Sequence, residues 1–443
     1  MASAAEQLAA NLNFSALAKS EELKNRIWFT LGALIVYRLG SYIPIPGIDS
    51  LALEQFATTN SSGILGWVNN LAGGALGRMA IFALNVMPYI SASIIMQLMT
   101  SVSPALEALK KEGESGRKKI NQYTRYFTVI LAALQAYGIA VGLQGQGGIV
   151  TNPGPFFIAS TVITLTGGTL FLMWLGEQIT SRGIGNGVSL IIFAGIVAGL
   201  PSGVAALLEL GRTGQMSMFT ILLIIVMAFA VIAFIVLVER AQRRLLIQYP
   251  KRQVGMKMTQ AESSHLPIKI NTAGVIPPIF ASSLLLLPIT VANFSAGQGP
   301  DWLNQITAML GHGQPLYLVL FAALIVFFSF FQTSIAFNPK ETAENLKKSG
   351  GFILGIRPGD KTADYLDWIL TRLTIIGAAY LVLICLIPEF LVGYSGIPFY
   401  FGGTSLLIVV SVTLDTVAQM QGHMLAQQYG KLLEKASLRS KKK

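Results

Sequence analysis

Residues 218–238 read MFTILLIIVMAFAVIAFIVLV and contain no charged side chain. A helix that crosses the roughly 30 Å of hydrocarbon in a bilayer needs about 20 mostly apolar residues, and this stretch meets that length. The whole chain of 443 residues has the same character, since 53% of it is hydrophobic and only 12% is charged. A soluble domain carries about 25% charged residues, so the sequence predicts a membrane protein.

Ten apolar runs of this kind follow one another along the chain. We expect spans at Ile27–Ile43, Met79–Val102, Tyr126–Leu143, Phe156–Leu175, Val188–Leu208, Met218–Val238, Ala273–Ala292, Pro315–Phe337, Leu373–Val392 and Phe399–Val417. Two groups of five spans run with opposite polarity, which permits an inverted repeat with a pathway between the halves. The predicted fold is an all-α polytopic membrane protein, with ten transmembrane helices in two inverted five-helix halves around a central pore. We place the halves at residues 23–208 and 209–420, between an N-terminal tail (1–22) and a C-terminal tail (421–443).

The basic residues are distributed very unevenly across these spans. If the N-terminus and every even-numbered turn share one side, that side holds all 32 Lys and Arg residues except Arg38, Arg78 and Arg212. Loops rich in Lys and Arg stay in the cytoplasm. We therefore expect a multi-pass protein of the cell inner membrane, with both termini cytoplasmic.

A segment between the first two spans is too apolar for a simple loop and too short for a span. Residues 63–78 read GILGWVNNLAGGALGR, a poor helix because it holds five glycines and two asparagines. At membrane depth such a segment needs protein or water to satisfy its backbone groups. The other interpretation is an ordinary external loop with a helix at the membrane surface.

Several motifs, in order and spacing that agree with the ten spans, are similar to those of one membrane protein family. They are Arg38-Leu-Gly-Ser-Tyr-Ile-Pro-Ile-Pro-Gly-Ile-Asp49, Gly73-Gly-Ala-Leu-Gly-Arg78, Met87-Pro-Tyr-Ile-Ser-Ala-Ser-Ile94, Gly183-Ile-Gly-Asn-Gly187, Gln242-Arg-Arg244, His265-Leu-Pro-Ile-Lys-Ile-Asn271, Gly355-Ile-Arg-Pro-Gly359 and Phe401-Gly-Gly-Thr-Ser405. On these motifs the chain resembles the SecY/Sec61-alpha family of protein-translocation channels. The resemblance implies a passive pore for unfolded preproteins, with a lateral gate through which signal or transmembrane helices enter lipid.

The resemblance also implies two parts that close the pore. A ring of apolar side chains at mid-membrane falls on Val86, Ile90, Val188, Ile192, Ile279 and Ile408. A plug falls on residues 63–77, with Gly63, Trp67, Asn69, Asn70, Gly73 and Gly74. A narrow ring of branched aliphatic side chains offers water no hydrogen bonds, so it dewets and blocks ions. The plainer interpretation of each ring residue alone is contact with lipid or with a neighbouring helix.

Three positions depart from the family pattern. Val86 replaces the usual isoleucine of the ring, Asn85 stands where glycine is expected, and Pro278 directly follows Pro277. The first change predicts a slightly looser ring, and the other two bear on the local backbone of spans two and seven.

The gate implied by the resemblance lies between spans two and seven. Ser91, Gln135 and Asn271 lie on candidate gate helices. Polar contacts across a membrane bundle contribute only about 0.6–2 kcal/mol, which is weak enough for a signal helix to displace. The alternative is a plain hydrogen bond between helices without a gating role.

Two loops, at about residues 239–272 and 338–372, are too long and too basic to be simple connectors. The resemblance implies that these loops are docking sites for the SecA motor and for the ribosome. Ribosomal RNA would contact the chain only through these loops, where basic side chains attract its phosphates and salt weakens the attraction. The candidate docking residues are Arg243, Arg244, Lys251, Arg252 and Arg357. The alternative, which we favour for the scattered lysines, is that these charges set topology and meet anionic membrane lipids. The resemblance further implies SecE, clamping the two halves, SecG, and preprotein signal sequences as partners.

The sequence offers no catalytic machinery. The Gly183–Gly187 motif follows a membrane span rather than a strand, so it is not a nucleotide loop. The histidines are far apart, without metal-ligand spacing. We predict no enzymatic activity, no metal site and no cofactor, so that a partner or the membrane potential must supply the work.

The rival interpretation is a secondary transporter of a small solute. Such proteins hold ionisable groups deep in the helix bundle. In this sequence the ionisable residues Arg38, Glu177 and Asp415 lie near span ends.

Overall fold

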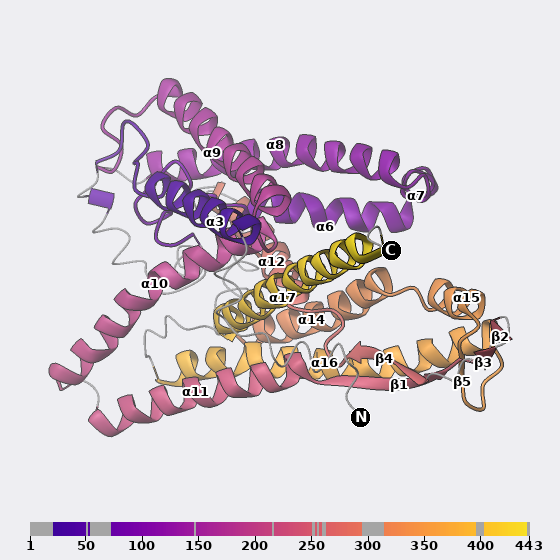
Figure 1. Ribbon diagram of the computed structural model, residues 1–443. Helices are drawn as coiled ribbons and strands as arrows, with labels where there is room; N and C mark the ends of the chain where they lie inside the picture. The colour runs from indigo at the N-terminus through magenta and orange to yellow at the C-terminus, as the bar shows by residue number, and fades with distance from the viewer. Residues whose placement is uncertain are drawn as a thin grey trace. The chain divides into compact units, whose positions relative to one another are not determined.

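The computed structural model describes residues 21–49, 52–53, 72–145, 148–214, 217–249, 253–254, 257–258, 263–294, 314–395 and 403–440. An α-helix lies over each of the ten predicted spans (Figure 1). These helices are α3 (Glu21–Gly40), α6 (Met87–Val102), α8 (Glu114–Gln144), α9 (Pro155–Arg182), α10 (Gly187–Arg212), α11 (Met218–Arg240), α12 (Ile276–Phe294), α14 (Pro315–Ala336), α16 (Asp360–Ser395) and α17 (Gly403–Ser440). Two shorter helices are α7 (Pro104–Lys111) and α15 (Pro339–Ser349).

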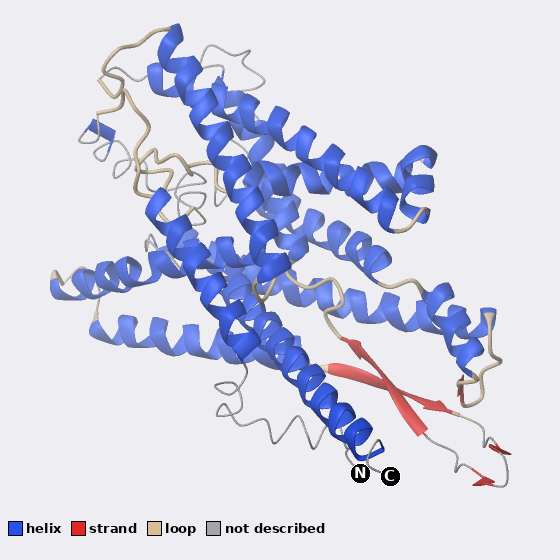
Figure 2. Cartoon of the chain, turned by 45° about the horizontal axis from the view of Figure 1, so that its top comes forward, coloured by secondary structure: helices blue, strands red, loops and turns tan. Residues whose placement is uncertain are grey.

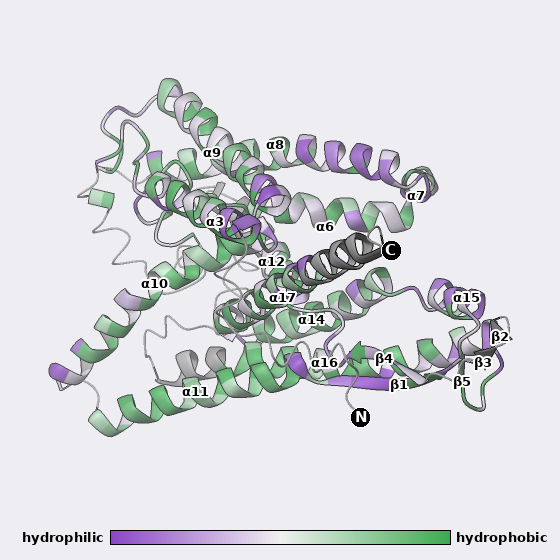
Figure 3. Cartoon of the chain, viewed as in Figure 1, coloured by the Kyte–Doolittle hydropathy of each residue, from purple (hydrophilic) through white to green (hydrophobic). Residues whose placement is uncertain are grey.

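Among the described residues, seven helices are long and apolar enough to cross a membrane, and α6 with α7 makes an eighth candidate span that is bent by 97°. The bend follows from Pro104, because the residue before a proline avoids the helical region, and Ser103 is extended with φ −92° and ψ 118°. Helix α11 is hydrophobic from Met218 to Val238 and hydrophilic only at its end, at Glu239 and Arg240 (Figure 3). Its Phe219, Leu222 and Phe229 side chains are exposed, as a surface that faces lipid requires.

The second predicted span begins later than its apolar run suggested. We expected helix from Met79, but residues 79–86 form turns and α6 begins at Met87. The backbone of this stretch pairs with the end of the first span, since Ile81 N–H donates to the carbonyl of Ile43 at 2.9 Å. Asn85 then has φ +50°, a left-handed conformation that ends any right-handed helix and that asparagine tolerates better than most residues. This conformation explains why the family pattern expects glycine at position 85.

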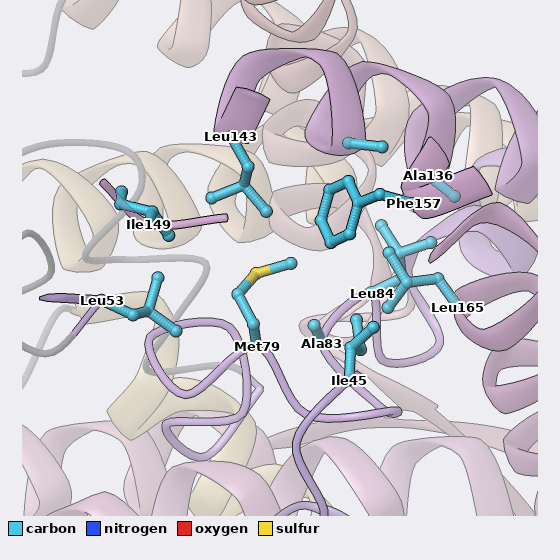
Figure 4. Packing of buried hydrophobic residues seen from close by; sticks show 11 residues of the cluster. Ile45, Leu53, Met79, Ala83, Leu84, Ala136, Leu143, Ile149, Phe157 and Leu165 are labelled. Atoms are coloured by element: carbon cyan, nitrogen blue, oxygen red, sulfur yellow. The ribbon is translucent and has the colours of Figure 1, made fainter. Parts of the chain in front are cut away.

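The residues of this turn region help to build a buried apolar core. Their side chains converge with those of α8 and α9, and Met79 lies near the middle of the group (Figure 4). The cluster contains Ile45, Leu53, Met79, Ala83, Leu84, Ala136, Ala140, Leu143, Ile149, Phe157 and Leu165.

Strands lie outside the membrane helices, which the all-α prediction omitted. β1 (Gln242–Gln248) and β4 (Ser263–Lys269) form an antiparallel hairpin in the first basic loop. β5 (Phe352–Ile353), from the second basic loop, pairs with the other edge of β1, giving a three-stranded sheet in the order β4-β1-β5 (strands in Figure 2). The strands β2 (Gln253–Val254) and β3 (Lys257–Met258) form a separate small pair.

Helix extends into two regions that the sequence predicted as a loop and a tail. The second basic loop was placed at residues 338–372, but α16 already begins at Asp360. The C-terminal tail was placed at 421–443, but α17 continues as helix to Ser440. Both helices therefore extend beyond the apolar runs from which the spans were predicted, because charged residues such as Lys361 are good helix formers although they are not apolar.

The chain divides into two compact units. The first unit contains residues up to Ala205, the end of α12 from Pro288, and α17 from Ile408. The second unit contains Ala206–Leu287 and Gln305–Leu407.

Helix α9 crosses the turn region closely enough to require glycine at one position, which gives a first prediction. A Cβ atom on Gly168 would overlap the carbonyl oxygen of Ile81, whereas a Cβ on Gly167 meets nothing within 4 Å. We expect Gly168→Ala to lower the free energy of unfolding by about 1–3 kcal/mol, because backbone must move. The matched control Gly167→Ala should be neutral or stabilising by up to about 1 kcal/mol. Thermal unfolding in detergent measures both, and equal melting temperatures for the two variants would contradict the close crossing.

Candidate functional site

Five of the six predicted ring residues lie in the first unit, on three helices. Val86 directly precedes α6, and Ile90 lies one turn later with its N–H donating to the carbonyl of Val86 at 3.0 Å. Val188 and Ile192 have the same spacing on α10, and Ile408 lies on α17. Because residues four apart share a helix face, α6 and α10 each present a pair of branched or aliphatic side chains on one face.

Burial separates these side chains from the surface that faces lipid. The exposed fraction is 0% for Val86, 7% for Ile90, 6% for Ile192 and 2% for Ile408, against 73% for Ile163 on α9. Contact with lipid is therefore excluded for these four residues. Ile279 is half-buried on α12 in the second unit, so the closure of all six residues around one pore stays a prediction.

The Gly183–Gly187 turn ties α10 to two other helices of the first unit. The N–H of Ile184 donates to Thr30 Oγ1 at 3.1 Å, and the N–H of Gly185 donates to Gln419 Oε1 at 2.9 Å. Gly185 has φ +89°, a conformation that glycine adopts without strain. The turn thus fixes the start of α10 to both α3 and α17. Helix α10 carries two predicted ring residues, and α17 carries a third, Ile408.

The ends of α3 and α17 also pack on each other beside this turn. Leu23, Ile184 and Met424 form a buried cluster. Gln427 Nε2 donates to the carboxylate of Glu22 at 3.0 Å. The Arg26 guanidinium, 3.1 Å from the same carboxylate, holds the pKa of Glu22 below its usual value.

Only the C-terminal end of the predicted plug lies within the described residues. Gly63, Trp67, Asn69 and Asn70 fall outside them, whereas Gly73 and Gly74 are described. The backbone of Gly73 lies against α10, because a Cβ placed on Gly73 would be 3.0 Å from the Cα of Gly195. Gly195 is three residues from Ile192, so the end of this segment lies within one helical turn of a predicted ring residue.

The three predicted gate residues are divided between the units. Ser91 is buried on α6 and Gln135 is half-buried on α8, in the first unit. Asn271 belongs to the second unit, where its amide Nδ2 donates to Glu239 Oε1 at 2.7 Å and to the carbonyl of Gly274 at 3.1 Å. This bond to Glu239, at the end of α11, was not predicted from the sequence.

Three of the five predicted docking residues are described, and all three are exposed. Arg243 and Arg244 are exposed on β1, and Arg357 is exposed in the turn that follows β5. Lys251 and Arg252 fall outside the described residues. Because β1 pairs with β5, strands from the two basic loops belong to one sheet.

This sheet is fixed to the membrane part of the second unit by apolar packing. The cluster joins the sheet to the first turns of α16 and contains Leu245, Ile268, Leu366, Ile369, Leu370 and Leu373. The basic side chains are therefore displayed on a rigid base.

Two arginines at the plug end were missed as functional residues. Arg38 and Arg78 bind backbone carbonyls of residues 73 and 74, and both guanidinium groups lie over the Tyr42 ring. In the sequence these two arginines stand out because they do not lie on the side of the membrane that is predicted to hold nearly all other Lys and Arg residues.

Across the described ranges, no group of three or more His, Cys, Asp or Glu side chains is placed to hold a metal.

Together these features define a class: a polytopic α-helical membrane protein with buried aliphatic side chains at α6, α10 and α17 and a basic sheet outside the helices. The family model described as SecY matches residues 80–417. Protein translocase subunit SecY of Escherichia coli (strain K12) is 56% identical over 422 residues, covering 94% of this chain and 95% of that protein. Protein translocase subunit SecY of Rickettsia bellii is 54% identical over 434 residues, covering 97% of this chain and 100% of that protein. This chain belongs to the SecY family.

Solved structures share the fold at much lower identity. The structure described as a protein conducting channel has a TM-score of 0.64 at 18% identity, covering 90% of this chain and 92% of that one. Sec61 in the canine ribosome-channel complex from the endoplasmic reticulum has a TM-score of 0.63 at 17% identity, over the same shares of the two chains.

Proposed function

We propose that this chain forms a protein-conducting channel, which moves unfolded preproteins across the membrane and releases signal or transmembrane helices into lipid through a lateral gate. The observation that carries the proposal is the identity of 54–56% to protein translocase subunit SecY, over at least 94% of this chain. A secondary transporter of a small solute does not account for that identity.

The buried aliphatic side chains suit a pore that accepts many sequences. Val86, Ile90, Val188, Ile192, Ile279 and Ile408 offer no hydrogen bond to water or to a passing chain. A narrow ring of such side chains excludes water and ions by dewetting. It can part around an unfolded chain of any sequence, because it makes no specific polar bond with it.

The predicted gate depends on contacts that a signal helix can displace. Asn271 lies at the entry to α12 and is held by two hydrogen bonds within its own unit. Bonds of this kind in a membrane bundle contribute only about 0.6–2 kcal/mol each. We propose that they set the position of α12 and thereby the balance between closed and open gate, with Ser91 and Gln135 on the other candidate gate helices.

The exposed arginines of the sheet supply a docking surface for whatever drives transport. We propose that Arg243, Arg244 and Arg357, with Lys251 and Arg252, contact the SecA motor or the ribosome, the latter through phosphate attraction that salt weakens. SecE and SecG are the proposed partner subunits. We therefore propose that the sheet and both termini lie in the cytoplasm, as expected from the distribution of Lys and Arg, and that the chain resides in the inner membrane.

The channel is tested by site-specific crosslinking to a stalled preprotein. A photoreactive residue at Ile90 or Ile279 should crosslink to the translocating chain, because both positions belong to the predicted ring. The control is Ile163, which is exposed on α9 and should crosslink to lipid only. Equal preprotein yields at Ile90 and Ile163, or none at any position, would exclude a central pore in this place.

A second prediction concerns the gate. Asn271→Leu removes the donor to Glu239 Oε1, so we expect a shift toward the open gate and increased export of a preprotein with a defective signal sequence. The control is Thr272→Val, which removes only a bond from Thr272 Oγ1 to the carbonyl of Lys269. Export of the defective substrate at the unmodified level in Asn271→Leu would remove the gating role.

A third prediction concerns docking. Arg357→Glu should abolish motor-driven export while the chain still inserts into the membrane and keeps its melting temperature, because the side chain is exposed. Lys348→Glu, a charge reversal at another exposed position of the same loop region, should retain export. Motor-driven export by Arg357→Glu at the unmodified rate would refute the contact.

A further inference from the structure

The three basic residues that break the charge asymmetry are not alike in their surroundings. Arg212 makes only an exposed contact with Glu209, at 3.8 Å. Arg38 and Arg78 are half-buried and converge on the carbonyl groups of residues 73 and 74, at the C-terminal end of the predicted plug. Topology alone does not explain two cations at this place.

Three consecutive carbonyl groups each accept hydrogen bonds from side chains. Tyr37 Oη donates to the carbonyl of Ala72 at 3.4 Å. The carbonyl of Gly73 accepts from Arg38 Nη1 at 2.8 Å and from Arg78 Nη2 at 2.9 Å, and the carbonyl of Gly74 accepts from Arg78 Nε at 3.1 Å. Bonds from a charged donor are about twice as strong as neutral ones.

The Tyr42 side chain joins the two guanidinium groups. Arg38 Nη2 donates to Tyr42 Oη at 2.8 Å. The guanidinium carbons of Arg38 and Arg78 lie 4.8 Å and 4.1 Å from the centre of the Tyr42 ring. The negative face of the ring and the shared carbonyl offset the repulsion between the two cations.

The backbone that the two arginines hold is itself specialised. Gly73 and Gly74 have φ +64° and +82°, a left-handed pair that other residues rarely adopt. This conformation turns successive carbonyls toward the arginines and brings Gly73 onto Gly195 of α10, beside the ring residue Ile192. The position of the segment end therefore depends on polar contacts and on close backbone approach, beside the buried residues Ala72, Ala75 and Ala80 and the buried side chain of Tyr37.

We propose that Arg38, Arg78 and Tyr42 are positioning residues that hold the end of the plug against α10 and so keep the resting channel closed to ions. The inference rests on the proposed channel function. Contacts of this kind suit a part that must leave and return, because water solvates both guanidinium and carbonyl groups once they separate. If large buried apolar side chains held the plug instead, exposing them to water at each opening would cost several kcal/mol.

The test compares ion leak with preprotein transport in the same preparation. The full-length chain, purified with its co-purifying subunits, is reconstituted in vesicles of phosphatidylethanolamine and phosphatidylglycerol. Without substrate, Arg38→Gln should raise the resting ion leak by about tenfold, the effect of losing one charge-assisted hydrogen bond to a carbonyl. Arg78→Gln, which loses two such bonds, should raise the leak by at least as much. Arg212→Gln should leave it unchanged. The double variant should raise the leak by less than the product of the two single increases, because both arginines bind the same carbonyl group, that of Gly73.

Tyr42 gives an independent variant that is not expected to disturb folding, since its side chain is 53% exposed. Tyr42→Leu should raise the leak, and Tyr42→Phe, which keeps the ring, should raise it less. Unchanged leak in Tyr42→Leu and in every folded arginine variant, with preprotein transport intact, would overturn the positioning role. Absence of preprotein transport by the unmodified chain would instead overturn the proposed function.

Discussion

A backbone amide or carbonyl that lies in hydrocarbon must find its partner within the protein, and this constraint governs the whole structure. The long helices meet it internally. Residues 72–86 are not helical and adopt left-handed conformations at Gly73, Gly74, Met79 and Asn85. Turn bonds within the segment, such as that from the N–H of Ala80 to the carbonyl of Ala75, satisfy part of its backbone. Other groups are satisfied by the end of the first span, through Ile43 and Ile45, and by the side chains of Tyr37, Arg38 and Arg78. The irregular segment therefore dictates which polar side chains surround it.

The sequence predicted the helices well because the length of an apolar run is a direct measure of what the bilayer demands. It placed the start of the second span eight residues too early, since Met79 and the residues after it are apolar whether they form a helix or a buried turn. The decisive feature, the left-handed backbone at Asn85, is a conformation and leaves no trace in composition. Helical continuation into charged sequence at Asp360 and beyond residue 421 was missed for a related reason, because an apolar run measures bilayer contact and not helix length.

The candidate site was predictable only in part. Single isoleucines in membrane helices carry no signal of their own, so the ring residues depended on the register of the family motifs, and burial now separates Val86, Ile90, Ile192 and Ile408 from lipid. The pairing of β1 with β5 joins residues more than one hundred positions apart, and no local pattern announces such a contact. The partner of Asn271 was equally remote in sequence, since Glu239 precedes it by a whole hairpin. Arg38 and Arg78 did carry a signal, as exceptions to an otherwise consistent charge rule.

The early start of α16 has a mechanical consequence. The helix begins at Asp360, three positions after Arg357, and its first turns are packed on the basic sheet. Its first 28 residues, Asp360–Ile387, contain no proline and precede Pro388. At a rise of about 1.5 Å per residue they form a rod of roughly 42 Å, longer than the hydrocarbon layer is thick. A tilt of about 5° imposed on the sheet would displace the far end of this rod by about 4 Å, so that a force on the sheet moves the part of α16 that lies inside the bilayer.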